Sequence, residues 1–266
     1  MIVVMRGDAP LIVSIPHAGT VVPDDLAGDV HSLERARYDA DLYIDKLYAF
    51  ATTLGATIVR TSLSRTVIDM NRDPSGVSLY PGQTTTDLCP LTTFDGEPLW
   101  RPGREPDEAE IARRREIYFE PYHKALEAEI ARLREEHDAI VLYEAHSIRS
   151  YVPRLFEGEL PQFNIGTNSG ASCAPVLTEA VEAVCETSGA SWITNGRFKG
   201  GWTTRHYGQP DKGVHAIQME LAMRGYVDEV GPYDWPPPWN EKRAEACRKA
   251  LRHILIKAIE FAEEQE

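Results

Sequence analysis

Short uninterrupted runs of apolar residues alternate along the chain with longer segments of helical periodicity. The clearest run, Ile140–Tyr143, is apolar on both faces of an extended backbone, which is typical of a strand buried in the middle of a parallel sheet. Shorter runs predict four more strands, at Leu11–Ile15, Ala56–Arg60, Phe163–Thr167 and Gly213–Ala222.

Helical periodicity follows these runs. Residues 34–54 carry apolar side chains at three- and four-residue spacing, which predicts one helix with a buried stripe. Residues 107–137, 174–188 and the segment from Cys247 to Phe261 predict three further helices. Pro121 should kink or split the helix over residues 107–137, because an interior proline costs about 3 kcal/mol. The alternation predicts an α/β fold in a single domain, residues 1–266, with a mixed, mostly parallel sheet flanked by helices.

Between strand and helix, residues 79–103 are rich in proline, glycine and threonine and have little periodicity. A loop of this length inside a compact domain is usually functional or disordered. Its aromatic residues favour an ordered loop that forms a wall or lid of a site.

Composition excludes several classes of protein. The net charge of −13 over 266 residues argues against a nucleic-acid partner, which needs a basic surface. No run reaches the roughly 18 residues of a membrane-spanning helix, and the N-terminus lacks the pattern of a signal peptide. The four cysteines form no CxxC pair. We therefore expect a cytoplasmic protein with free thiols.

Polar side chains recur at the ends of three predicted strands. His17 follows the first, Glu144 and His146 end the central one, and Glu220 lies in the last. A single histidine at a strand end is more commonly a structural residue. The recurrence favours a ligand site at the carboxyl edge of the sheet.

Two of these histidines suggest a metal site. Catalytic zinc commonly takes two histidines and a carboxylate from the protein and keeps one open position. His17 and His146 lack only the carboxylate, which the acids between Asp39 and Asp45 would supply. A solvated helix face explains those acids equally well. Glu220 would then act as general base toward a metal-activated water.

Arginines gather in two loops. Arg65, Asn71 and Arg72 suit a substrate carboxylate, because the guanidinium fork binds two oxygens at once, although they would also neutralise the chain's own acids. Residues 195–210 are rich in glycine and contain Arg197, Lys199, Arg205 and His206. We interpret this stretch as a mobile loop that closes over an anion, with a surface turn as the alternative. Arg113–Arg115 is expected to be solvated helix surface.

Other hydrolytic chemistries have little support. No G-x-S-x-G motif is present, and no cysteine has a context that predicts a thiolate. A metal-free binding protein for acidic amino acids is the alternative from a different class.

The order of His17, Asn71-Arg72, His146-Ser147 and Glu220 resembles the plan of the zinc metallocarboxypeptidases. More closely, the chain resembles the N-formylglutamate amidohydrolase family. The segments that carry this resemblance are IPHAG, DADLYIDKLY, SRTVIDMNRDP, LYPGQTTTDLCP, EAHSIRSYVPRLFEGELPQFNIGTNSGASC, NGRFKGGWTTRHYGQP and HAIQMEL.

The resemblance implies a zinc-carboxypeptidase-like (phosphorylase/hydrolase-like) fold and one divalent metal ion, zinc. It also implies hydrolysis of N-formyl-L-glutamate to L-glutamate and formate, the last step of a histidine degradation route. His17 and His146 would bind the metal, Glu220 would be the base, and Asn71 and Arg72 would bind a substrate carboxylate.

Two assignments stay open. Carboxypeptidases have their carboxylate ligand three residues after the first histidine, where this chain has Thr20. We expect Asp41 in its place, with Asp39 as the alternative. The second carboxylate of glutamate needs another cation, for which Arg205, with His206 beside it, and Arg65 are the candidates. Hydrolysis of another N-acyl amino acid or of a γ-glutamyl peptide is the alternative activity. The sequence does not indicate an oligomeric state.

Overall fold

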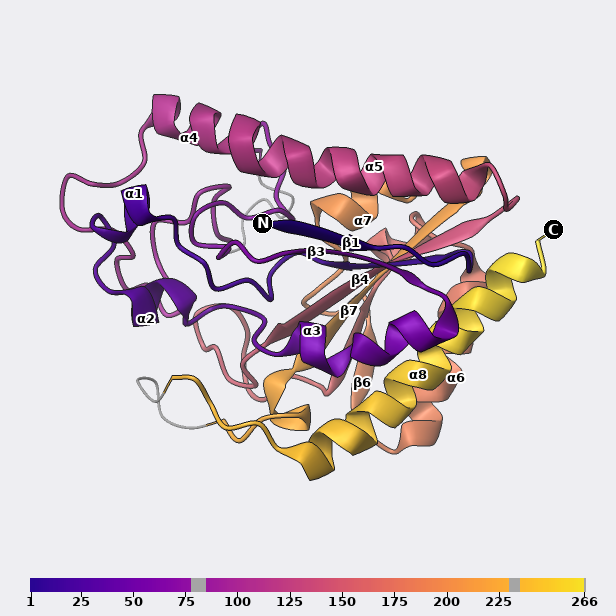
Figure 1. Cartoon of the computed structure of the whole chain (residues 1–266). Coiled ribbons are helices and arrows are strands. Elements are labelled where there is room, and N and C mark those ends of the chain that lie inside the picture. The colour runs from indigo at the N-terminus through magenta and orange to yellow at the C-terminus, as the bar shows by residue number, and fades with distance from the viewer. Residues whose placement is uncertain (78–84, 230–234, 266) are drawn as a thin grey trace.

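The computed structural model describes residues 1–77, 85–229 and 235–265. Its centre is a seven-stranded sheet in the order β1-β3-β2-β4-β7-β5-β6 (Figure 1). The strands are β1 Ile2–Met5, β2 Leu11–Ile15, β3 Thr57–Thr61, β4 Ile140–Ile148, β5 Phe163–Gly166, β6 Trp192–Thr194 and β7 Val214–Ala222. Within this described part, four of the six strand pairings are parallel and two, β1 with β3 and β5 with β7, are antiparallel. The predicted mixed, mostly parallel α/β fold is confirmed, whereas the single domain over residues 1–266 stays a prediction.

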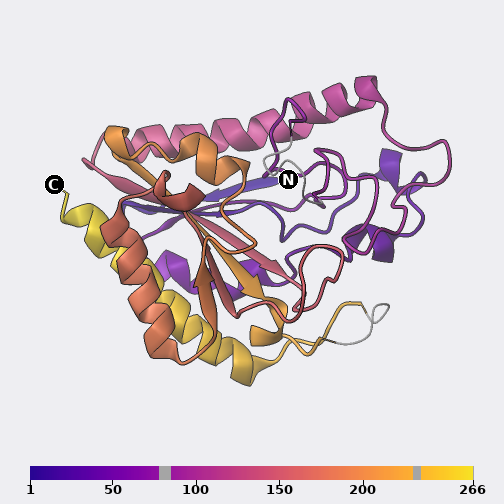
Figure 2. The same ribbon diagram turned by 180° about the vertical axis from the view of Figure 1, so that it is seen from behind.

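Helices cover both faces of the sheet. In Figure 1 one face carries α4 Glu108–Arg114 and α5 Glu120–Arg134, and the other carries α3 Ile44–Leu47, α6 Pro175–Ser188 and α8 Glu241–Glu263; Figure 2 shows the same layers from behind. The short helix α7 Trp202–Tyr207 packs against β4 and β7. Helices α1 Asp24–Ala27 and α2 Leu33–Arg37 lie in the loops beyond the sheet. The 3-10 helices are Ala49–Leu54, Asn168–Gly170, Pro210–Lys212 and Met223–Gly225.

Each face of the sheet has its own apolar core. On one face Leu142 packs with residues of α5 such as Leu126 and Leu133. On the other, Tyr143 packs with Leu251 and Ile254 of α8. This division follows the alternation of a strand, in which successive side chains point to opposite faces. Because β4 and β7 lie in the interior of the sheet, all of their residues are buried.

The helix predicted over residues 34–54 is wrong as a single element. The structure breaks it into α2, α3 and a 3-10 helix, and Tyr43, at the start of α3, has a φ of 64°. The backbone N–H of Asp41 donates to the carbonyl of His17 instead of continuing a helix. A contact with a distant strand end therefore overrides the local periodicity, and it moves Asp41 away from the face of Asp45.

The helix predicted over residues 107–137 is present with the expected irregularity. Residues Arg115–Phe119 form a π-helical turn between α4 and α5, directly before Pro121. Proline has no N–H to donate to the preceding turn, so a local change in hydrogen bonding accommodates it without separating the two helices. Arg114 is not solvated as expected, since it is buried, donates to the carbonyl of Val67 and lies over the Trp100 ring.

Of the two predicted loops, one is ordered as expected in its described part, and the other has more structure than expected. The described part of the loop 79–103 begins at Thr85, and its Trp100 is buried and pairs with Val30; residues 79–84 lie outside the described residues. The stretch 195–210, predicted as a mobile loop, contains helix α7.

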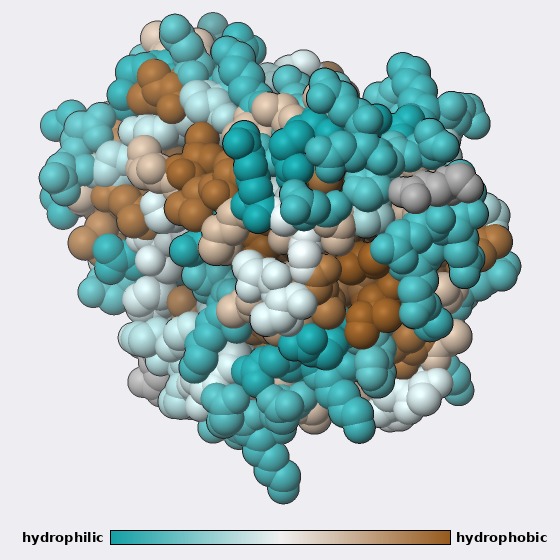
Figure 3. Space-filling model, turned by 45° about the vertical axis from the view of Figure 1, so that its right-hand side comes forward, coloured by the Kyte–Doolittle hydropathy of each residue, from teal (hydrophilic) through white to brown (hydrophobic). Residues whose placement is uncertain are grey.

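Hydrophilic side chains cover most of the face drawn in Figure 3, and apolar residues form separate patches between them. None of the helices in the described part of the chain has the length and apolar content to cross a membrane.

Candidate metal and catalytic site

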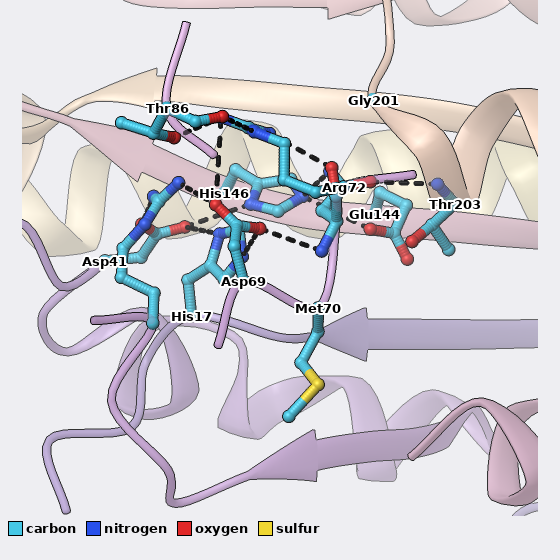
Figure 4. A network of polar contacts seen from close by, with 12 residues as sticks. His17, Asp41, Asp69, Met70, Arg72, Thr86, Glu144, His146, Gly201 and Thr203 are labelled. Carbon is cyan, nitrogen blue, oxygen red and sulfur yellow. Dashed lines mark hydrogen bonds and ion pairs between the residues drawn. The ribbon is translucent and has the colours of Figure 1, made fainter. Parts of the chain in front are cut away.

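Three adjacent parallel strands bring the predicted site residues to one edge of the sheet. β4 lies between β2 and β7, and its register places His146 opposite Glu220. His17 follows the end of β2, so its ring comes within 4.9 Å of the His146 ring, measured between centroids. Figure 4 shows the two imidazoles side by side. The strand-end pattern in the sequence therefore places distant residues together correctly.

Asp41 completes this group. Its Oδ2 lies 3.1 Å from Nδ1 of His146 and 3.8 Å from Nδ1 of His17. The backbone N–H of Ser147 also donates to Oδ2, which fixes the carboxylate. One donor atom from each of His17, Asp41 and His146 lies within 4.8 Å of the other two, and all three residues are buried.

The other acids of the same segment point elsewhere. Asp39 binds Arg149 and accepts the N–H of Phe94, and Asp45 forms an ion pair with Arg60 at the surface. Of the acids between residues 39 and 45, only Asp41 joins the two histidines among the described residues.

The second ring nitrogens contact two further carboxylates. Nε2 of His17 lies 2.8 Å from Asp69, and Nε2 of His146 lies 3.2 Å from Glu144 (Figure 4). Both Nδ1 atoms thus face Asp41. Nε2 of His146 also lies 3.0 Å from the side-chain amide nitrogen of Asn71, so both Nε2 atoms have polar partners on the side away from Asp41. Metal-binding histidines are commonly oriented in this way by an outer carboxylate. This donor set fits a cation bound between the two Nδ1 atoms and Asp41.

Arg65 balances the acids behind the histidines. Its guanidinium donates to Asp69 at 2.7 Å and to Asp41 at 3.4 Å. Although burial alone would raise the pKa of Asp69, Arg72, His17 and Arg65 hold it well below its usual range. Both acids are therefore held as carboxylates inside the protein.

The two histidines differ in protonation. Burial, together with the nearby charge of Arg65, lowers the pKa of His17 to about 4, so this imidazole is neutral at pH 7. Burial also opposes a charge on His146, but its hydrogen bonds with Asp41 and Glu144 raise its pKa to about 10. A bound cation would replace that proton, since a ligating imidazole must be neutral.

Glu220 is poised as a base. It lines the same pocket as both histidines, and burial raises its pKa to about 7, against the opposing charge of His146. A general base works best when its pKa lies near the working pH. Gln218, two residues earlier on the same face, donates to Glu220 at 3.4 Å.

The pocket in front of these groups is lined by cationic, acidic and apolar side chains. Asn71 and three arginines, Arg65, Arg72 and Arg197, line it together with apolar side chains. The predicted residues Arg65, Asn71 and Arg72 are therefore where the sequence suggested.

The prediction that Arg205 and His206 reach the substrate is not supported. Neither is among the described residues that line the pocket. Helix α7 turns Arg205 back onto the carbonyl of Gly200, and the exposed ring of His206 stacks on Trp202. The helical backbone, which the glycine content of the stretch did not predict, is the reason.

Sequence reasoning gave no role to Asp69 and Gln218. It named Glu144 only as a polar residue at a strand end, and it placed Arg197 in an anion-binding loop without choosing it for a substrate carboxylate. The period-two spacing of a strand was a usable signal for Glu144 and Gln218, which precede His146 and Glu220 by two residues. Asp69 and Arg197 lie in loops, where no such periodicity applies.

The sheet, its buried imidazole and carboxylate donors and the glutamate opposite them suit a hydrolytic enzyme that acts without a serine or cysteine nucleophile. The chain belongs to the N-formylglutamate amidohydrolase family, which it matches over residues 9–227. It is 44% identical to an N-formylglutamate deformylase of Pseudomonas aeruginosa over 98% of this chain and 96% of that protein. It is 43% identical to one of Pseudomonas putida over the same shares of both chains.

The fold agrees with this membership. The structure of an N-formylglutamate amidohydrolase from Ralstonia eutropha superposes with a TM-score of 0.83 at 22% identity, covering 100% of this chain and 99% of that chain. The likeness covers the whole chain, and it shows that the two proteins share a fold.

Proposed function

We propose that this protein hydrolyses N-formyl-L-glutamate to formate and L-glutamate. The observation that carries the proposal is the cluster of His17, Asp41 and His146 beside Glu220, in a pocket lined by arginines. Relatives that match nearly the whole chain are N-formylglutamate deformylases. A small substrate with two carboxylates is compatible with the arginines that line the pocket.

His17, Asp41 and His146 would hold one divalent ion, zinc. Zinc suits two imidazoles and a carboxylate, and when bound it polarises a carbonyl oxygen and makes water a stronger acid. Asp69 and Glu144 keep the histidine rings oriented through their Nε2 atoms. Arg65 keeps Asp41 and Asp69 charged.

Glu220 moves the proton of the reaction. Its carboxylate takes a proton from the water that attacks the formyl carbon, and it returns that proton to the amide nitrogen as the C–N bond breaks. The products are formate and the free amine of glutamate. Because Glu220 is buried, bulk water does not solvate its carboxylate fully, and the carboxylate is a stronger base.

Arg72 binds one carboxylate of the substrate, with Asn71 beside it. The guanidinium is fixed in place, because it donates to the carbonyl and hydroxyl of Thr86 and to the carbonyl of Asn71. Three of its five N–H groups are used in this way, which leaves N–H groups for an anion in the pocket. Asn71 itself is fixed by the backbone N–H of Thr203.

The proposal is tested by formate release from N-formyl-L-glutamate before and after removal of metal with a chelator. We expect release that disappears on chelation and returns with zinc. Full activity of the metal-free protein would contradict the metal site, and no activity in either state would favour a binding protein instead.

A matched pair of variants tests the carboxylate ligand. Asp41→Asn should lose zinc and activity, whereas Asp45→Asn, which removes a surface acid four residues away, should keep both. Equal zinc contents in the two variants would overturn the assignment of Asp41.

Rates on N-formyl-, N-acetyl- and N-succinyl-glutamate separate this activity from hydrolysis of another N-acyl amino acid. We expect the formyl substrate to be fastest by a wide margin. A place at the end of histidine degradation and a cytoplasmic location stay predictions.

A further inference from the structure

The pocket contains one more arginine than the proposed chemistry has used. Arg65, Arg72 and Arg197 all line it. Arg65 already neutralises Asp41 and Asp69, and its side chain is only 9% exposed. Arg72 serves one substrate carboxylate in the proposed function. Arg197, which comes from the glycine-rich stretch, is therefore the arginine to examine for the other carboxylate.

Contacts with the neighbouring loop hold Arg197 in the pocket wall. Its Nε donates to the carbonyl of Leu155 at 2.7 Å, and its guanidinium carbon lies 5.5 Å from the centre of the Phe198 ring. Leu155 and Phe198 also line the pocket. A guanidinium held in the wall of a pocket is suited to a ligand carboxylate, to which its planar fork donates strong charge-assisted hydrogen bonds.

The segment that carries Arg197 is tied to the catalytic edge. The backbone N–H of Gly201 donates to Gln218, and that of Thr203 donates to Asn71. Gly201 lies so close to Asn71 that a Cβ on it would come 2.3 Å from the Asn71 amide nitrogen. Only glycine permits this approach. The segment is thereby fixed relative to the residues beside Glu220 and Arg72.

We propose that Arg197 binds the side-chain carboxylate of the substrate and so sets a preference for acidic N-formyl amino acids over neutral ones. The inference rests on the proposed function, in which Arg72 binds one substrate carboxylate, and it assigns the α-carboxylate to Arg72. Arg197 is then a specificity-determining residue, and Arg205, on helix α7, has no part in binding.

The test compares N-formyl-L-glutamate with N-formyl-L-glutamine, which differs only in the neutral amide of its side chain. Arg197→Met keeps a long apolar side chain against Leu155 and Phe198 while removing the charge. We expect kcat/KM for the glutamate substrate to fall about 100-fold, mainly through KM, because a hydrogen bond to a charged group is lost. The glutamine substrate should change by no more than about threefold.

Two further variants sharpen the test. Arg197→Lys keeps the charge without the planar fork, and we expect it to restore part of the preference. Arg205→Met examines the other arginine of the segment. A collapse of the preference at residue 205 instead of 197, or an equal loss on both substrates in Arg197→Met, would overturn the inference.

Binding of the product separates this inference from the activity itself. Calorimetry with L-glutamate and L-glutamine on the zinc-loaded protein should show weaker L-glutamate binding in Arg197→Met and unchanged L-glutamine binding. If the wild-type protein releases no formate from either substrate, the proposed function fails. The calorimetric comparison still decides Arg197, because L-glutamate affinity equal to that of the wild type would overturn it.

Discussion

The two faces of strands β4 and β7 are equally buried but differ in chemistry. On the face toward α8, both strands contribute to one apolar core, through Tyr143 and Ala145 of β4 and Met219 and Leu221 of β7. On the opposite face Leu142 and Ala216 are followed by the polar residues Glu144, His146, Gln218 and Glu220, and the apolar Ile148 and Ala222 then end the strands.

The difference shows where the protein places buried polarity. Charged groups are costly to bury unless they are paired or used. Along β4 and β7 the two glutamates and His146 lie on one face only, near the carboxyl ends of the strands, where His146 and Glu220 line a pocket. The other face carries His215 and Ser147 as its buried polar residues. The opposite face provides packing for the same backbone. We therefore expect substitutions on one face to change chemistry, and on the other to change stability.

The largest effect is expected from Glu220→Gln on the site face. The amide cannot accept the proton of water, so kcat should fall by about 10²- to 10⁴-fold. Zinc content and the melting temperature should stay close to those of the wild-type protein. Retained turnover with full zinc would remove Glu220 from the role of base.

The neighbouring residue provides the contrast. Met219→Ala removes a fully buried side chain that points to the other face, and it should lower the free energy of unfolding by about 2–5 kcal/mol. The rate per folded, zinc-loaded molecule should be nearly unchanged. Urea unfolding and kcat measured on the same sample check this. A large loss of kcat with little loss of stability would break the distinction between the faces.

Glu144→Gln tests whether the buried carboxylate that contacts Nε2 of His146 strengthens zinc binding. Loss of the carboxylate at Nε2 of His146 should weaken zinc binding about 10- to 100-fold. Tyr143→Phe is the control, because it removes a hydrogen bond to Tyr48 on the opposite face and should leave zinc binding as it was. Competition with a chromophoric chelator measures both affinities. Unchanged affinity in Glu144→Gln would limit its role to packing.

A smaller effect concerns a buried histidine outside the metal cluster. His123 of α5 lies between Tyr207 and the carbonyl of Met70, and burial lowers its pKa to about 4. The unfolded chain takes up this proton near pH 6.5, so His123 favours folding above that pH and loses its contribution as the pH falls toward 4. Between pH 6.5 and 5.5 the metal-free protein should lose about 1 kcal/mol more than His123→Gln. Parallel urea titrations of the two proteins check this, and identical pH slopes would contradict it.

Among the described residues, sequence pattern was sufficient for five of the seven strands and for the site residues that they carry, whereas β1 and β6 were missed. The apolar runs identify β2, β4 and β7 as buried strands, which lie parallel and adjacent in the sheet. Their carboxyl ends therefore bring His17, His146 and Glu220 to one edge, as predicted. The spacing of residues along a strand is local information, and it survives folding because the strand backbone is regular.

Two positions in the site depend on contacts between distant segments, which a local sequence pattern cannot indicate. They are the third metal ligand, Asp41, and the arginine for the second substrate carboxylate, Arg197. Periodicity placed Asp41 and Asp45 on one helix face, but a hydrogen bond to the His17 carbonyl breaks that helix. Likewise, the glycine-rich stretch contains both Arg197 and Arg205, and the sequence reasoning chose Arg205 as a candidate for the second carboxylate. Contacts of Gly201 and Thr203 with Gln218 and Asn71 fix the stretch, and only Arg197 lines the pocket in the described part of the chain.

The most direct test of the account is a crystal structure of the zinc-loaded protein with anomalous data collected at the zinc edge. We expect one strong peak within bonding distance of His17, Asp41 and His146, with Glu220 facing it across the pocket. A peak held by other residues, or zinc-loaded crystals with no peak at these three, would contradict it.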